Sequence, residues 1–188
     1  MSEVFAVKQA DVADVEIRTP PLRLPDAAST ADIVLNQAME YCAQKMGLEA
    51  AWLAVEHLKQ GDGTACSYCR YSTAKQMAEA LGSLDENVRA VYVYDYDATP
   101  EDICFGEAVH TSPIHLILWV ERKTSALNSL VEALDHALAQ SYAAMIDRSQ
   151  LAHILDVQMV DDADVENRTG YGALLSSLYN RPLKVWER

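Results

Sequence analysis

Basic side chains are scarce in this sequence. Its 188 residues hold 15 Lys and Arg against 28 Asp and Glu, which gives a formal net charge of −13. A surface this negative repels a phosphate backbone, and the densest basic cluster, the C-terminal "RPLKVWER", is too small to form a patch. We therefore expect no nucleic-acid partner.

Long apolar runs are lacking as well. No run approaches the roughly 18–20 apolar residues that a membrane-spanning helix needs. The N-terminal "MSEVFAVKQADVADVE" carries acids early and lacks the apolar stretch of a secretion signal. These absences predict a cytoplasmic protein without a membrane partner, in which all four cysteines (Cys42, Cys66, Cys69 and Cys104) are reduced.

What is present is enough apolar material for a core, since 50% of the residues are hydrophobic. Residues 1–28 contain "TPPLRLP", whose prolines favour an extended N-terminal arm. Residues 29–62 are predicted to form a helical hairpin, because Ser29 and Asp32 resemble a capping box and Gly47 fits the position after a helix end.

The remaining chain, residues 67–188, alternates between helical and strand-like hydrophobic periods. That order of elements predicts an α/β (α+β) fold in which helices flank a small sheet. The helices of the whole chain are expected at about 30–46, 48–60, 67–81, 125–142 and 171–179, and the strands at about 88–97, 112–122 and 153–162, followed by a final extended segment.

Three stretches of this part resemble one known family. "FGEAVHTSPIHLILWV" (105–120) resembles the hairpin "RGEA…SDIDLLV", with Ser112, Ile114 and Leu116 at matching positions. "ILDVQMVD" places Asp156 where the family carries its third acid, and "GALLSSLYNRPLKVWER" resembles the family's closing helix and strand. The chain from about residue 67 onward is thus similar to the nucleotidyltransferase superfamily in its minimal, polymerase beta-like form, which implies a small mixed sheet.

The resemblance also shows which functional residues have been replaced. In active members two aspartates and the third acid hold two Mg²⁺ ions, which clamp the triphosphate. Pro113 and His115 stand at the positions of the two aspartates, and the phosphate-binding Gly-Ser pair is not recognisable. The interpretation is a degenerate member, not an enzyme, that acts as a binding, regulatory or interaction module, with a small molecule or nucleotide as its possible ligand.

An alternative interpretation keeps catalysis. Asp95 and Asp97 in "DYD" lie on one side of a strand end and, with Asp156, could rebuild a three-carboxylate Mg²⁺ site for nucleotidyl or phosphoryl transfer. The same Asp-x-Asp could mimic the motif of glycosyltransferases, for which the chain is short. The simplest possibility is that both acids belong to a solvated loop.

His115 is a second candidate ligand. Together with Asp156 and His110 it could bind Zn²⁺ or another borderline metal. Alternatively, His115 is a hydrogen-bonded residue inside the sheet.

Cys66 and Cys69 form a Cys-x-x-Cys at a predicted helix start, where the helix dipole would lower a thiol pKa. A zinc site would need two further ligands, and only Cys42 and His57 are nearby helical candidates. A thioredoxin-like motif would need a preceding strand, which is missing. The remaining interpretation is that the thiols are structural or incidental.

Self-association is the last expectation. The segment "VEIRT" in the N-terminal arm has no evident partner strand, and unpaired edges tend to pair. In the hairpin, Trp52, Leu53, Val55 and Leu58 surround more than one helix face, so a single contact would leave apolar surface uncovered. These features predict a homodimer.

Overall fold

The computed structural model describes residues 27–94, 113–148, 151–179 and 181–188 of the chain. Ten helices and strands follow one another in these ranges. They are α1 (Ala27–Met46), α2 (Ala51–Lys59), α3 (Gly63–Leu84), β1 (Val88–Val93), β2 (Ile114–Val120), α5 (Ser125–Met145), β3 (Leu155–Val160), α6 (Asp162–Asn167), α7 (Gly172–Leu175) and β4 (Leu183–Glu187).

The four described strands form one mixed sheet in the order β3-β2-β1-β4. β1 pairs antiparallel with both β2 and β4, whereas β2 and β3 run parallel and are connected through α5. The three expected strands therefore share one sheet, and the final extended segment is its fourth strand. The expected α/β (α+β) class is confirmed.

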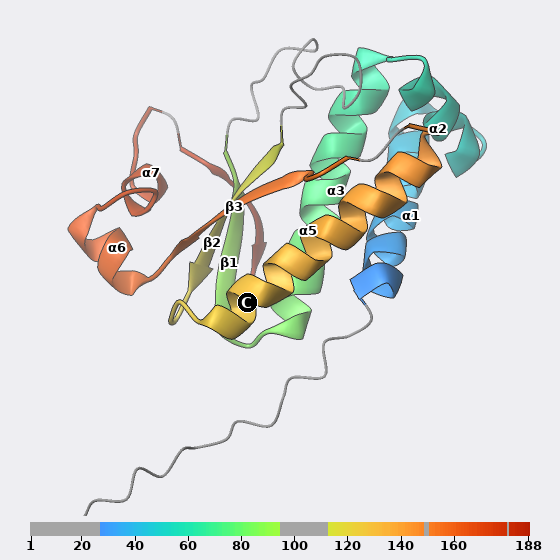
Figure 1. The fold of residues 1–188 in the computed structure, drawn as a ribbon. Helices are drawn as coiled ribbons and strands as arrows, with labels where there is room; N and C mark the ends of the chain where they lie inside the picture. The colour runs from blue at the N-terminus through green and yellow to red at the C-terminus, as the bar shows by residue number, and fades with distance from the viewer. Residues whose placement is uncertain (1–26, 95–112, 149–150, 180) are drawn as a thin grey trace, which may run out of the picture.

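The long helices α3 and α5 cover one face of this sheet, and α1 packs against both of them on the same side (Figure 1). α5 is amphipathic because Leu127, Leu130, Leu134 and Leu138 recur at helical spacing, and all four are buried. The strands bury alternate residues against the same layer: Val91 and Val93 from β1, and Ile114, Leu116, Leu118 and Val120 from β2.

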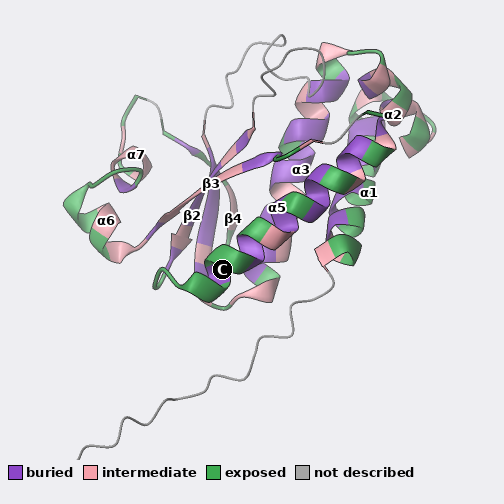
Figure 2. Cartoon of the chain, viewed as in Figure 1, coloured by how far each residue is buried: buried purple, intermediate pink, exposed green. Residues whose placement is uncertain are grey.

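The other face carries a much smaller apolar cluster. Its buried members are Ala90, Tyr92, Ile117 and Val160. The short helices α6 and α7 lie on this side, and Figure 2 colours them mainly as intermediate or exposed. Among the described residues this face is therefore thinly covered, which leaves polar side chains near solvent.

The starts of the first three helices differ from the expected ones, and α2 begins at Ala51 instead of about residue 48. α3 begins at Gly63, before the predicted residue 67, because the Asp62 carboxylate accepts hydrogen bonds from the amides of Thr64 (2.8 Å) and Ala65 (3.2 Å) and caps the helix. α1 begins at Ala27, so Ser29 lies inside the helix and the predicted capping box is wrong.

Helix α6 was not predicted from the sequence. It has no buried residue, so hydrophobic periodicity gives no signal for it. A capping box sets its start instead: Asp161 accepts a bond from the amide of Asp164, and Asp164 accepts one from the amide of Asp161. Arg168 ends the helix in the left-handed region, at φ 54°.

The last strand is held against α3 by close packing. A Cβ on Gly82 would lie 2.2 Å from the Trp186 ring, so only glycine allows this approach. Arg188 donates to the carbonyl of Gly82 at 2.6 Å. The C-terminal strand and the end of α3 are therefore fixed to each other.

α1 and α2 form the expected helical hairpin, and α1 also packs on α3 and α5. We predicted that part of the apolar surface of the hairpin would stay uncovered. Trp52 is indeed 64% exposed, whereas Leu58 is buried. Residues 1–26 of the predicted arm lie outside the described residues. None of the described helices combines the length and apolar character needed to cross a membrane.

Candidate functional site

The candidate site lies where β2 and β3 begin and β1 ends. His115 on β2 and Asp156 on β3 are direct partners in the parallel ladder. Both follow a residue buried in the helix layer, so strand alternation directs both side chains to the thinly covered face. Tyr94, just after β1, is packed on the same face.

The Asp156 carboxylate is surrounded by hydrogen-bonding partners. His115 Nδ1 lies 2.9 Å from Oδ2, the Tyr94 hydroxyl donates to the same oxygen at 3.4 Å, and Gln158 Nε2 donates to Oδ1 at 2.8 Å. A neutral His115 donates its Nδ1 proton to the carboxylate, which leaves Nε2 as an acceptor. Asp156 therefore fixes the tautomer and the orientation of the imidazole.

Two tyrosine rings, those of Tyr94 and Tyr171, lie beside this pair. The centroid of Tyr94 lies 4.9 Å from that of His115 and 5.4 Å from that of Tyr171. Burial raises the pKa of Tyr94 well above its usual value, and the hydrogen bond with Tyr171 and the negative charge of Asp156 add to the rise. Tyr94 therefore stays a neutral donor beside the carboxylate.

A buried aspartate on α5 positions the start of β3. Asp135 Oδ1 accepts hydrogen bonds from the amides of Ile154 and Leu155, both at 2.8 Å, and Oδ2 lies 2.6 Å from His153 Nδ1. Because Leu155 directly precedes Asp156, these bonds set the register that brings Asp156 opposite His115. Sequence analysis missed Asp135, although an acid within the apolar stripe of an amphipathic helix was a usable signal.

The described side chains do not assemble a metal centre. His115 and Asp156 do come together, but no three His, Cys, Asp or Glu side chains in the described ranges are grouped as metal ligands. His110, the third predicted Zn²⁺ ligand, lies outside those ranges, as do Asp95 and Asp97 of the predicted Mg²⁺ site.

Comparison with protein-family models, with curated proteins and with solved structures finds no match to this chain.

Pro113, which the sequence resemblance aligned with an aspartate, makes its contact here through its backbone. Its carbonyl accepts a hydrogen bond from the guanidinium of Arg70, a buried residue of α3. That bond ties the start of β2 to the helix layer, so the position is structural here.

Cys66 and Cys69 do not form a pair of reactive thiols with a lowered pKa. Cys69 is buried and unpaired, and burial raises its pKa to about 12. Cys42 is likewise unpaired, and burial raises its pKa to about 11. Cys66 is disulfide-bonded, so the expectation of four reduced thiols is wrong for it.

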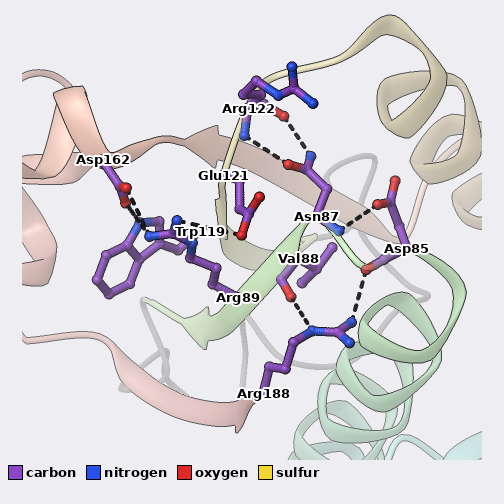
Figure 3. A network of polar contacts seen from close by, with 9 residues as sticks. All are labelled: Asp85, Asn87, Val88, Arg89, Trp119, Glu121, Arg122, Asp162 and Arg188. Atoms are coloured by element: carbon purple, nitrogen blue, oxygen red, sulfur yellow. Dashed lines mark hydrogen bonds and ion pairs between the residues drawn. The ribbon is translucent and has the colours of Figure 1, made fainter.

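A second polar cluster lies at the opposite end of β1 and β2 (Figure 3). Arg89 binds both carboxylate oxygens of Asp162 at 2.9 and 2.8 Å, and the Trp119 indole donates to the same carboxylate at 2.9 Å. Nearby, the Asn87 side chain pairs with the backbone amide and carbonyl of Arg122. The side chains of Arg89, Asn87 and Asp162 all have protein partners, so this cluster anchors α6 and the β1–β2 pair.

Proposed function

We propose that this protein is a binding or interaction module with nucleotidyltransferase-like architecture that does not transfer nucleotides. The observation that carries the proposal is the hydrogen bonding of the Asp156 carboxylate. Both of its oxygens accept hydrogen bonds, Oδ2 from His115 and Tyr94 and Oδ1 from Gln158. A Mg²⁺ ion, which binds a carboxylate at about 2.0–2.1 Å, would compete with these donors.

The neighbouring positions support the same proposal. His115 is a poor ligand for a hard cation such as Mg²⁺, and Pro113 offers no side-chain ligand. The net charge of −13 also disfavours the docking of a triphosphate. A ligand of this site would instead use the exposed parts of the His115 and Tyr171 rings, together with the hydrogen-bonding groups of Gln158.

A nucleotide-transfer assay tests the proposal. The protein is incubated with Mg²⁺, labelled nucleoside triphosphates and candidate acceptors, alongside Asp156→Ala and the control Asp147→Ala, which alters an exposed residue at the end of α5. We expect no transfer by any of the three. Transfer that Asp156→Ala abolishes and Asp147→Ala retains would overturn the proposal.

Calorimetry tests whether the site binds a ligand. The same proteins and His115→Gln are titrated with nucleosides, nucleotides and divalent metal ions. We expect any ligand of the site to lose affinity on His115→Gln and to keep it on Asp147→Ala.

One observation favours a second candidate, a metal-dependent nucleotidyl or phosphoryl transferase. Tyr94 directly precedes Asp95 in the sequence, and its hydroxyl reaches Asp156. A rebuilt site of Asp95, Asp97 and Asp156 would require the first two acids to approach the carboxylate that Tyr94 contacts. This candidate needs Mg²⁺-dependent activity that is lost in each of the three aspartate-to-alanine variants.

A further inference from the structure

The sheet has two edge strands, and one of them, β3, is open. Within the described residues β3 pairs only with β2, and no other strand lies beside it. Val157, Gln158 and Met159 are all half-buried, as expected of a strand that is open along its side.

The backbone groups that point to this open side can be identified. The Ile114 amide donates to the Ile154 carbonyl at 2.7 Å. In a parallel ladder, alternate residues direct both of their backbone groups to the same neighbour. Asp156 and Gln158 therefore bond to β2, whereas Val157 and Met159 direct their amides and carbonyls away from the sheet.

The other edge, β4, carries features that block pairing. Pro182 precedes the strand, the charges of Lys184 and Glu187 lie on it, and its register with β1 shifts at a bulge opposite Val91 and Tyr92. Natural sheets use proline, lysine and bulges to prevent edge-to-edge association. β3, with the sequence "LDVQMV", has no proline, no basic residue and an uninterrupted register.

We propose that β3 is the surface through which two copies of this chain associate, by antiparallel pairing across a two-fold axis at Gln158. This inference rests on the interaction role proposed above and names its interface. In that register Val157 of one copy lies opposite Met159 of the other, and each pair exchanges both backbone hydrogen bonds. The two sheets become one continuous sheet.

The side chains of β3 fit a second copy in this register. Val157 and Met159 form apolar cross-strand pairs on the helix-covered face, and Gln158 meets its own equivalent on the other face. The single charge of the strand, Asp156, lies opposite Val160, so no like charges face each other directly. The register centred on Val157 is less suitable because it would need the Leu155 amide, which Asp135 already occupies.

The test uses the full chain and a matched pair of variants. Gln158→Lys keeps a donor next to Asp156 but places two like charges opposite each other at the axis. Gln44→Lys makes the same change on the exposed side of α1. Light scattering coupled to size exclusion, at tens of micromolar protein in physiological salt, should give twice the 20.8 kDa chain mass for the wild type and for Gln44→Lys, and a monomer for Gln158→Lys.

Hydrogen exchange locates the interface. We expect the amides of Val157 and Met159 to be protected in the wild type and to exchange at least tenfold faster in Gln158→Lys, while the β1 and β2 amides are unchanged. A monomeric wild type would overturn the inference, and so would a dimer that survives Gln158→Lys with Val157 and Met159 exchanging rapidly. Neither result depends on nucleotide transfer, so the interface and the proposed function fail separately.

Discussion

The two faces of the sheet differ in how much apolar packing covers them. On one face, α1, α3 and α5 bury a continuous apolar core, and the strand residues Leu116 and Leu118 are inaccessible to solvent. On the other face, the described residues that cover the strands belong to α6, α7 and a small cluster around Ile117. His115 and Asp156 lie on this second face.

This difference assigns the stability of the fold to one face and ligand binding to the other. A thick apolar layer stabilises the fold and excludes water, so it cannot present polar groups to a ligand. A thinly covered face can hold a hydrogen-bonded His–Asp pair near solvent while the core behind it keeps the strands in register. Predictions that compare matched residues on the two faces therefore test the division directly.

The largest effect is expected on the helix-covered face. Leu118 is fully buried there, and Leu118→Ala leaves a cavity that three packed helices cannot close. We expect a loss of about 4 kcal/mol in the free energy of unfolding, measured by urea denaturation. Leu178→Ala, at a 92% exposed position, is the control and should change stability by less than about 0.5 kcal/mol.

The adjacent residue provides the comparison on the other face. Ile117 is also fully buried, but its cover comes from two short helices that can shift toward the cavity. We expect Ile117→Ala to cost about 2–3 kcal/mol in the same measurement, less than Leu118→Ala. Equal costs for the two variants would show that both faces are packed equally tightly.

Alkaline pH should sharpen the comparison, because each face contains a tyrosine with a raised pKa. Burial is the main cause for Tyr142 on the helix-covered face and for Tyr94 at the site. The pKa of each tyrosine is higher in the folded state than in the unfolded state. Its contribution to the free energy of unfolding is therefore fully present below the unfolded pKa of about 10 and is lost as pH rises through the folded pKa.

Asp156→Asn distinguishes the two tyrosines. It removes a negative charge beside Tyr94 only, so the pKa of Tyr94 should fall while that of Tyr142 stays constant. Ultraviolet titration of tyrosinate in the Tyr94→Phe and Tyr142→Phe backgrounds measures each one. An unchanged pKa of Tyr94 in Asp156→Asn would contradict the hydrogen-bond arrangement described for the site.

The smallest effect concerns the thiols beneath the helix layer. Burial raises the pKa of Cys69 to about 12 and that of Cys42 to about 11, so little thiolate exists near neutral pH. We expect negligible alkylation of either residue by iodoacetamide in the native protein and rapid alkylation in urea, followed by mass spectrometry. Native labelling as fast as in urea would show that the helix layer opens easily.

Much of the fold follows from sequence pattern. The near-continuous apolar run "IHLILWV" predicted a buried strand, and the leucine spacing of 125–142 predicted α5, which the structure extends to Met145. α6 was not predictable from periodicity because it buries nothing and depends on two aspartates that cap it. The start of α3 was misplaced because Asp62 was not considered as its cap.

The site was predictable only in part. Strand alternation and the resemblance together placed His115 and Asp156 near each other, and they are hydrogen-bonded. The contributions of Asp135, Gln158 and Tyr171 depend on which segments meet in space, and no local pattern carries that information. The nucleotidyltransferase-like architecture and the homodimer stay predictions.

The contact between Gly82 and Arg188 also bears on how the chain folds in time. The two residues are 106 positions apart, and closing so long a loop costs entropy that local helix contacts do not. We therefore expect the helices α1 to α3 to pack early and β4 to dock late, after β1 and α3 have taken their places. Interactions absent from the transition state govern the unfolding rate more than the folding rate. The Trp186–Gly82 contact then acts mainly on how long each folded molecule survives before it opens.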